Sequence, residues 1–185
     1  MDHITVIFVT ENVQCFGDRR MVAMEYLAHP SDWGYTEVHA EIEANNVCYS
    51  AVGHPPSACV LKYSFRRRLE SQPFVECVEI PVTNLKRAQQ ILESLSDNHA
   101  TYRIPFMEFL VPTPFVKDVD LEPSHWGHLF CSQFVLLCLK RMRREGILAL
   151  PADRLAHLDD CPTVTCTPSH LRHILDRVLP SHENH

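Results

Sequence analysis

One segment constrains the fold more than any other: two alternating apolar stretches joined by a pair of asparagines. In Val38–Ile42 the polar residues His39 and Glu41 alternate with apolar ones, which is the two-residue period of a strand with two different faces. Asn45-Asn46 follows, and asparagine tolerates the left-handed backbone of a tight hairpin. Val47–Val52 then predicts the returning strand. We therefore expect an antiparallel β-hairpin that carries a histidine and a glutamate on one face.

Other parts of the chain predict more strands and, after them, helices. β-branched and aromatic residues indicate strands at Ile4–Val9, Ala58–Phe65 and Phe74–Ile80, and Pro81 is expected to close the last of these. Apolar residues recur at helical spacing in three later segments, Leu85–Leu95, Phe130–Glu145 and Pro168–Val178. Consecutive strands followed by helices predict an α+β fold, with an antiparallel sheet packed against helices.

The predicted helices have recognisable ends. Thr83 or Asn84 can cap the first helix, and Thr167 stands before a proline at the start of the last one. Gly146 is expected to stop the middle helix, because glycine adopts the backbone conformation that ends helices. These boundaries leave no linker that would divide residues 1–185, so we expect a single domain. The 45% apolar content can fill one sizeable core for this length.

The overall charge and hydropathy argue against several classes of partner. The formal net charge is -6, whereas binding to phosphates normally requires a basic surface, so no nucleic-acid partner is expected. No stretch approaches the length of a membrane span, and the first residues lack the basic and apolar regions of a signal peptide. We therefore expect a cytoplasmic protein, in a host cell or of viral origin, with no integral membrane segment. No oligomeric state is predicted.

Eight cysteines invite a disulfide or zinc interpretation. With no export signal and a chain too large to need stapling, we expect reduced thiols. A zinc-binding interaction module remains an alternative, because Cys161 and Cys166 are followed by His170 and His173. Pro168 is expected to start a helix, however, and both histidines would lie in its first turns. We predict no metal and no cofactor.

The segment around Cys131 carries the clearest chemical signal. It places a cysteine at the opening of a strongly apolar helix, where unpaired N–H groups and the helix dipole stabilise a thiolate. The backbone N–H there could also bind an oxyanion. A thiol hydrolase needs a base that changes charge near neutral pH, and His39 on its strand is the candidate. The structural alternative is a small buried cysteine and a hydrogen-bonded strand histidine.

These residues, in this order, resemble a known family. A strand histidine, a returning strand that ends Tyr49-Ser50-Ala51, and a helix that opens Phe130-Cys131-Ser132 are similar to the circularly permuted branch of the NlpC-type papain-like superfamily. That branch includes lecithin:retinol acyltransferase-like proteins, bacterial lipoprotein-like hydrolases and proteins of large DNA viruses. The resemblance implies a papain-like fold with Cys131 as nucleophile and His39 as base.

The resemblance also implies a third catalytic position and a reaction class. Glu41 fits the acidic position two residues after the histidine, whereas relatives often carry the orienting residue on the next strand, where this chain has Ser50. The implied activity is a thiol hydrolase, a peptidase, amidase or acyl-ester hydrolase, that forms a thioester with an amide- or ester-containing peptide, protein or lipid. An acyltransferase acting on lipid is an alternative, and aromatic residues in Thr101–Ser124 could wall an apolar channel. A papain-like binding or structural protein without catalytic activity is another.

Overall fold

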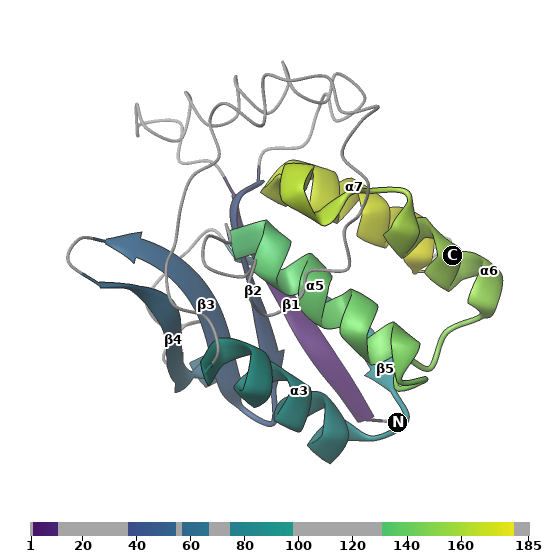
Figure 1. Ribbon diagram of the computed structural model, residues 1–185, viewed down its shortest axis with the longest axis horizontal. Helices are drawn as coiled ribbons and strands as arrows, with labels where there is room; N and C mark the ends of the chain where they lie inside the picture. Colours follow the sequence, from purple (N-terminus) through teal and green to yellow (C-terminus); the bar gives the residue numbers. More distant parts are fainter. Residues whose placement is uncertain (1, 11–36, 55–56, 67–74, 98–130, 180–185) are drawn as a thin grey trace.

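The computed structural model describes residues 2–10, 37–54, 57–66, 75–97 and 131–179. The strands of this part of the chain build one antiparallel sheet in the order β4-β3-β2-β1-β5 (Figure 1). Their bounds are β1 Asp2–Thr10, β2 Glu37–Ala44, β3 Val47–His54, β4 Ser57–Ser64 and β5 Val75–Val82. The predicted loop at Thr101–Ser124 lies outside the described residues.

The predicted hairpin is confirmed as β2 and β3. Asn45 and Asn46 have φ angles of 53° and 64°, the left-handed backbone that asparagine tolerates better than most residues. Ala44 pairs with Val47 across the turn. The register of the hairpin is therefore determined locally by its two-residue turn.

The prediction that Pro81 closes its strand is wrong, because β5 continues through it to Val82. Pro81 pairs with His3 of β1. Proline has no backbone N–H to donate to a neighbouring strand, but among the described strands β5 lies at the edge of the sheet, next to β1 alone. The carbonyl oxygen of Pro81 instead accepts a hydrogen bond from the Ala149 N–H at 2.9 Å.

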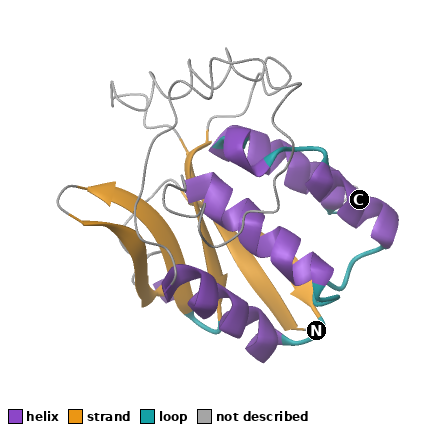
Figure 2. Ribbon diagram, in the orientation of Figure 1, coloured by secondary structure: helices purple, strands orange, loops and turns teal. Residues whose placement is uncertain are grey.

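The helices follow the strands, as predicted, and cover one face of the sheet (Figure 2). The three predicted segments correspond to α3, α5 and α7, while the short α6 and two 3₁₀ turns were not predicted. Their bounds are α3 Leu85–Asp97, α5 Cys131–Arg144, α6 Ala152–Ala156, η3 His157–Asp159, η4 Thr163–Thr165 and α7 Pro168–Val178. The described part of the chain is thus of the α+β class. None of its helices combines the length and apolar character needed to cross a membrane.

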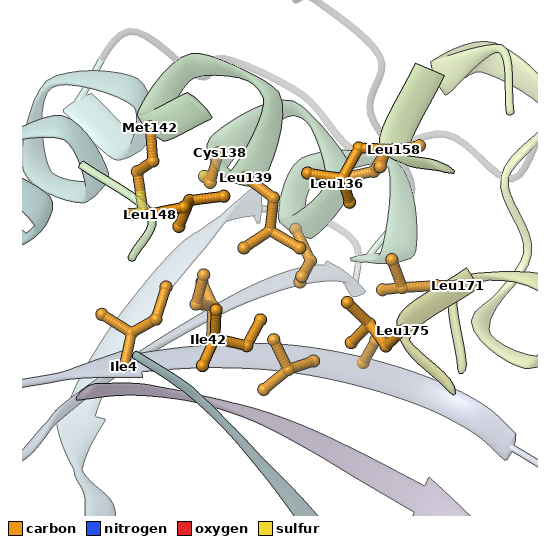
Figure 3. Packing of buried hydrophobic residues seen from close by; sticks show 14 of the residues in the cluster. Ile4, Ile42, Leu136, Cys138, Leu139, Met142, Leu148, Leu158, Leu171 and Leu175 are labelled. Carbon is orange, nitrogen blue, oxygen red and sulfur yellow. The ribbon is translucent and has the colours of Figure 1, made fainter. Parts of the chain in front are cut away.

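The apolar core lies between the sheet and these helices. One buried cluster contains residues of the sheet and of α5 and α7, among them Ile4, Ile42, Leu136, Leu139 and Leu171, and Leu139 of α5 points towards the sheet (Figure 3). All five side chains are fully buried, and each such burial contributes about 1.5–3 kcal/mol relative to exposure. The core therefore fixes α5 against the centre of the sheet.

Two buried hydrogen bonds add direction to this packing. The Ser132 hydroxyl donates to the carbonyl oxygen of Cys166 at 2.6 Å, and the Ser169 hydroxyl donates to the carbonyl oxygen of Glu37 at 3.2 Å. The first joins the start of α5 to the segment before α7, and the second joins α7 to the start of β2. The beginnings of α5 and β2 are therefore held in one buried framework.

Candidate functional site: a cysteine, a histidine and a buried carboxylate

Cys131 is the first residue of α5 and has no exposed surface. Its neighbour Ser132 anchors this end of the helix through the hydrogen bond to Cys166. The first backbone N–H groups of an α-helix have no partner within the helix, and the helix dipole is positive there. The sulfur is thus placed where local structure favours negative charge, as the sequence predicted.

His39 of β2 is held by two polar neighbours through one ring nitrogen. Its Nε2 lies 3.0 Å from the Ser50 hydroxyl oxygen and 3.1 Å from Glu41 Oε1. The Ser50 hydroxyl donates its only hydrogen to Glu41 Oε1, at 3.2 Å, so towards Nε2 both neighbours are acceptors. Nε2 therefore carries a hydrogen, and Nδ1 is the nitrogen that gains and loses a proton.

Glu41 is a carboxylate held almost out of solvent. Its side chain is 3% exposed, and both of its oxygens accept hydrogen bonds from hydroxyl groups. Ser50 of β3 donates to Oε1, and Tyr63 of β4 donates to Oε2. A buried charge is tolerated when it is paired and hydrogen-bonded, and here three neighbouring strands supply the carboxylate, the two hydroxyls and the imidazole.

The electrostatics of the site join His39 to Cys131. Burial by itself lowers the pKa of His39, but the charge and hydrogen bond of Cys131, followed by those of Glu41, raise it to about 10. Opposite charges close to an imidazole favour its protonated form. The protonated form of His39 is therefore favoured between the sulfur of Cys131 at the start of α5 and the buried carboxylate of β2.

Other described thiols lie in different environments. Burial raises the pKa of Cys138 well above its ordinary value. The pKa of Cys77, which is exposed, is also raised, by partial burial and then by the charges of Glu79, Glu43 and Glu76. Neither thiol has a histidine among the causes of its shift, so both serve as internal references for the reactivity of Cys131.

The structure brings together all four residues that the sequence singled out, and it adds a fifth. Cys131, His39, Glu41 and Ser50 come from α5, β2 and β3. Tyr63 was missed, although its strand was predicted. No local sequence signal identifies Tyr63, because the register that pairs it with Cys48 places β4 one strand beyond Ser50 only in the folded sheet.

The residues of the alternative zinc module do not form a metal site. The thiol of Cys161 donates to the carbonyl oxygen of Pro162 at 3.3 Å, and that of Cys166 donates to Thr167 at 3.7 Å. His170 and His173 lie on α7 with ring centroids 6.1 Å apart. Within the described ranges, no group of three or more potential metal ligands is placed to hold an ion.

Comparison with known proteins assigns no relative: no family model, no curated protein and no solved structure matches this chain.

Proposed function

We propose that this chain is a thiol hydrolase of permuted NlpC-type, papain-like architecture, with Cys131 as nucleophile, His39 as base and Glu41 as the group that orients His39. The observation that carries the proposal is the position of the imidazole. On one side it interacts with a cysteine at a helix start, and on the other with a buried carboxylate. This is the nucleophile, base and orienting group that covalent acyl transfer requires.

The geometry supports a division of labour between the two ring nitrogens. Because Nε2 is held as a donor by Glu41 and Ser50, Nδ1 is the nitrogen that holds the proton given up by Cys131 in a thiolate–imidazolium pair. The thiolate attacks the carbonyl carbon of an amide or ester, and an oxyanion forms near the first N–H groups of α5. The imidazolium returns its proton to the departing amine or alcohol, which leaves a thioester on Cys131.

The second half of the reaction decides between two activities. If water attacks the thioester, a carboxylic acid is released and the thiol is regenerated, which makes the protein a hydrolase of peptide, protein or lipid substrates. If the hydroxyl or amine of a second substrate attacks instead, the acyl group is transferred. The same three residues serve both outcomes, and we propose hydrolysis because it requires no second binding site.

One observation favours a second candidate, a papain-like binding or structural protein without turnover. Cys131 has no exposed surface, whereas a nucleophile must meet the carbonyl carbon of its substrate. The same network of Cys131, His39 and Glu41 would then stabilise the fold alone. The two candidates differ in the reactivity of the sulfur.

The test is the pH dependence of Cys131 alkylation, followed by mass spectrometry with iodoacetamide. If His39 and Cys131 form an ion pair, the alkylation rate at Cys131 is expected to be nearly the same at about pH 6.5 as at about pH 8.5. A free thiol would react much faster at the higher pH, because its ordinary pKa is about 8.5. Cys77 is the reference in the same sample, and its rate should rise steeply over this range. The shape of the profile is the readout, because burial slows the absolute rate.

His39→Ala is the diagnostic variant, and His3→Ala is its matched control. His3 is also a strand histidine near a glutamate, at 3.7 Å from Glu79, but it is exposed. His39→Ala should give Cys131 the steep pH dependence of Cys77, and His3→Ala should leave the profile flat. A steep profile at Cys131 in the unaltered protein would refute the hydrolase proposal and favour the binding scaffold.

A further inference from the structure

We propose that Tyr63 is a positioning residue of the site: its hydroxyl, which reaches Glu41 across β3, fixes the carboxylate in the orientation that places Oε1 against His39 Nε2. The inference rests on the proposed function for its role in catalysis. The Tyr63 hydroxyl donates to Glu41 Oε2, and it acts on His39 through this carboxylate.

The sheet topology explains why a tyrosine is needed at this position. β4 and β2 are separated by β3, and neighbouring strands lie about 4.8 Å apart. Tyr63 pairs with Cys48 of β3, and Cys48 pairs with Glu43 of β2. A hydroxyl that starts on β4 must therefore cross a whole strand to reach β2. A serine or threonine is too short for this, whereas a phenol ring spans the distance.

Hydrogen bonds from other strands are needed to orient the Glu41 carboxylate, because Glu41 and His39 lie two residues apart on the same strand. Side chains two residues apart on one strand stand parallel to each other, so nothing in β2 itself turns the carboxylate towards the imidazole. A carboxylate with a single donor can also rotate about its terminal bond. Donors on both oxygens, Ser50 at Oε1 and Tyr63 at Oε2, fix the plane of the group.

Because Glu41 is buried, the loss of one of its hydrogen-bond donors should change the orientation of its carboxylate. The Glu41 side chain is 3% exposed, so water cannot readily replace a missing donor. Removal of the Tyr63 hydroxyl would take this donor from Oε2, and the carboxylate would turn towards its remaining donors. That movement weakens its contact with Nε2. The ionisable groups that face His39 in the described part of the chain are Cys131 and Glu41, so a displaced Glu41 should be visible in the titration of the imidazole.

The experiment is the titration of His39 by NMR in protein labelled with ¹⁵N-histidine, in the unaltered chain and in Tyr63→Phe. The variant keeps the ring and removes only the hydroxyl. The pKa of His39 is expected to fall by about one, the size of effect when one hydrogen bond of a buried charged network is weakened. Tyr49→Phe is the matched control: it removes another tyrosine hydroxyl, on β3, from a residue that belongs to the apolar core, and should leave the titration unchanged.

An unchanged His39 titration in folded Tyr63→Phe would overturn the inference. If that variant does not fold, as judged by far-UV circular dichroism, 3-fluorotyrosine at position 63 keeps the ring and the hydroxyl, changes the strength of the hydroxyl as a donor, and should still shift the His39 titration. The measurement needs no substrate, so it is separate from the test of the proposed function. A lowered His39 pKa in Tyr63→Phe together with a steep Cys131 profile in the unaltered chain would support the positioning role and refute the hydrolase. An unchanged His39 pKa together with a flat Cys131 profile would refute the positioning role and support the hydrolase.

Discussion

At the scale of single residues, Glu41 is the group on which the site depends most. Its oxygens accept hydrogen bonds from Ser50 and Tyr63, and Oε1 also lies against His39. The negative charge contributes to the raised pKa of His39, both directly and through its hydrogen bond. A neutral group of the same shape would keep the packing and lose the charge.

Glu41→Gln is therefore expected to lower the pKa of His39 from about 10 towards 6.5, by more than Tyr63→Phe lowers it, because the charge itself is lost. NMR titration of the labelled histidine measures this change. Glu79→Gln is the control, since Glu79 is an exposed carboxylate near His3. An unchanged His39 titration in Glu41→Gln would mean that the carboxylate is not the partner of the imidazole.

The same change has a consequence for stability with a definite sign. The pKa of His39 is raised in the folded state, so its protonation stabilises the fold fully below pH 6.5, and this contribution is lost as the pH rises towards about 10. The decline over that range, measured by urea unfolding, should be weaker in Glu41→Gln than in the unaltered chain.

At the scale of elements, α5 has a C-terminal end that is fixed by a specific backbone motif. The helix ends at Arg144 and is closed by Gly146, which has a φ angle of 67°. The Gly146 N–H donates to the Arg143 carbonyl and the Ile147 N–H to the Met142 carbonyl, each at 2.9 Å. This pair of bonds is the Schellman motif, which requires a left-handed residue after the helix.

Gly146→Ala is expected to lower the free energy of unfolding by about 1 kcal/mol, because the Cβ of alanine disfavours the left-handed backbone conformation. A Cβ placed there would meet nothing within 4 Å, so the loss reports backbone strain without a clash. Gly146→Asn should lose less, since asparagine tolerates this region better. Urea unfolding compares the three chains, and equal stabilities would contradict the left-handed end of α5.

At the scale of the whole molecule, one buried cluster joins the sheet to α3, α5 and α7. Phe134 of α5 is 1% exposed within this cluster, and Leu137, three residues later in the same helix, is only partly buried against it. Because the cluster spans elements far apart in the chain, loss of packing at one point should weaken all of them together. The single domain predicted from the sequence remains a prediction that unfolding experiments can test.

Phe134→Ala is expected to cost about 3–5 kcal/mol, through lost burial and the cavity left behind. Leu137→Ala is the control from the same helix, where the side chain is only partly buried, and its cost should be clearly smaller. In a single cooperative domain, far-UV circular dichroism and the exposure of the buried Cys138 thiol should report the same urea midpoint in each variant. Separate midpoints would contradict a single domain.

The sequence by itself determined the elements whose signals are local. The asparagine pair specified the hairpin turn, Gly146 specified the end of α5, and Thr167 specified the start of α7, where its hydroxyl accepts the His170 N–H at 3.1 Å. Turn and cap preferences act within a few residues, so they can be recognised without tertiary structure. The candidates Cys131 and His39 were found for the same reason, from a helix start and a strand alternation.

Only the tertiary structure decided which distant segments meet. It placed β1 between β2 and β5, which made β5 an edge strand and allowed it to pass through Pro81. It also buried Lys140, whose ammonium donates to the Cys161 carbonyl at 2.8 Å, and brought Tyr63 to Glu41. Such contacts depend on how whole faces are buried against one another, and the free energy of that burial is shared by residues far apart in the chain.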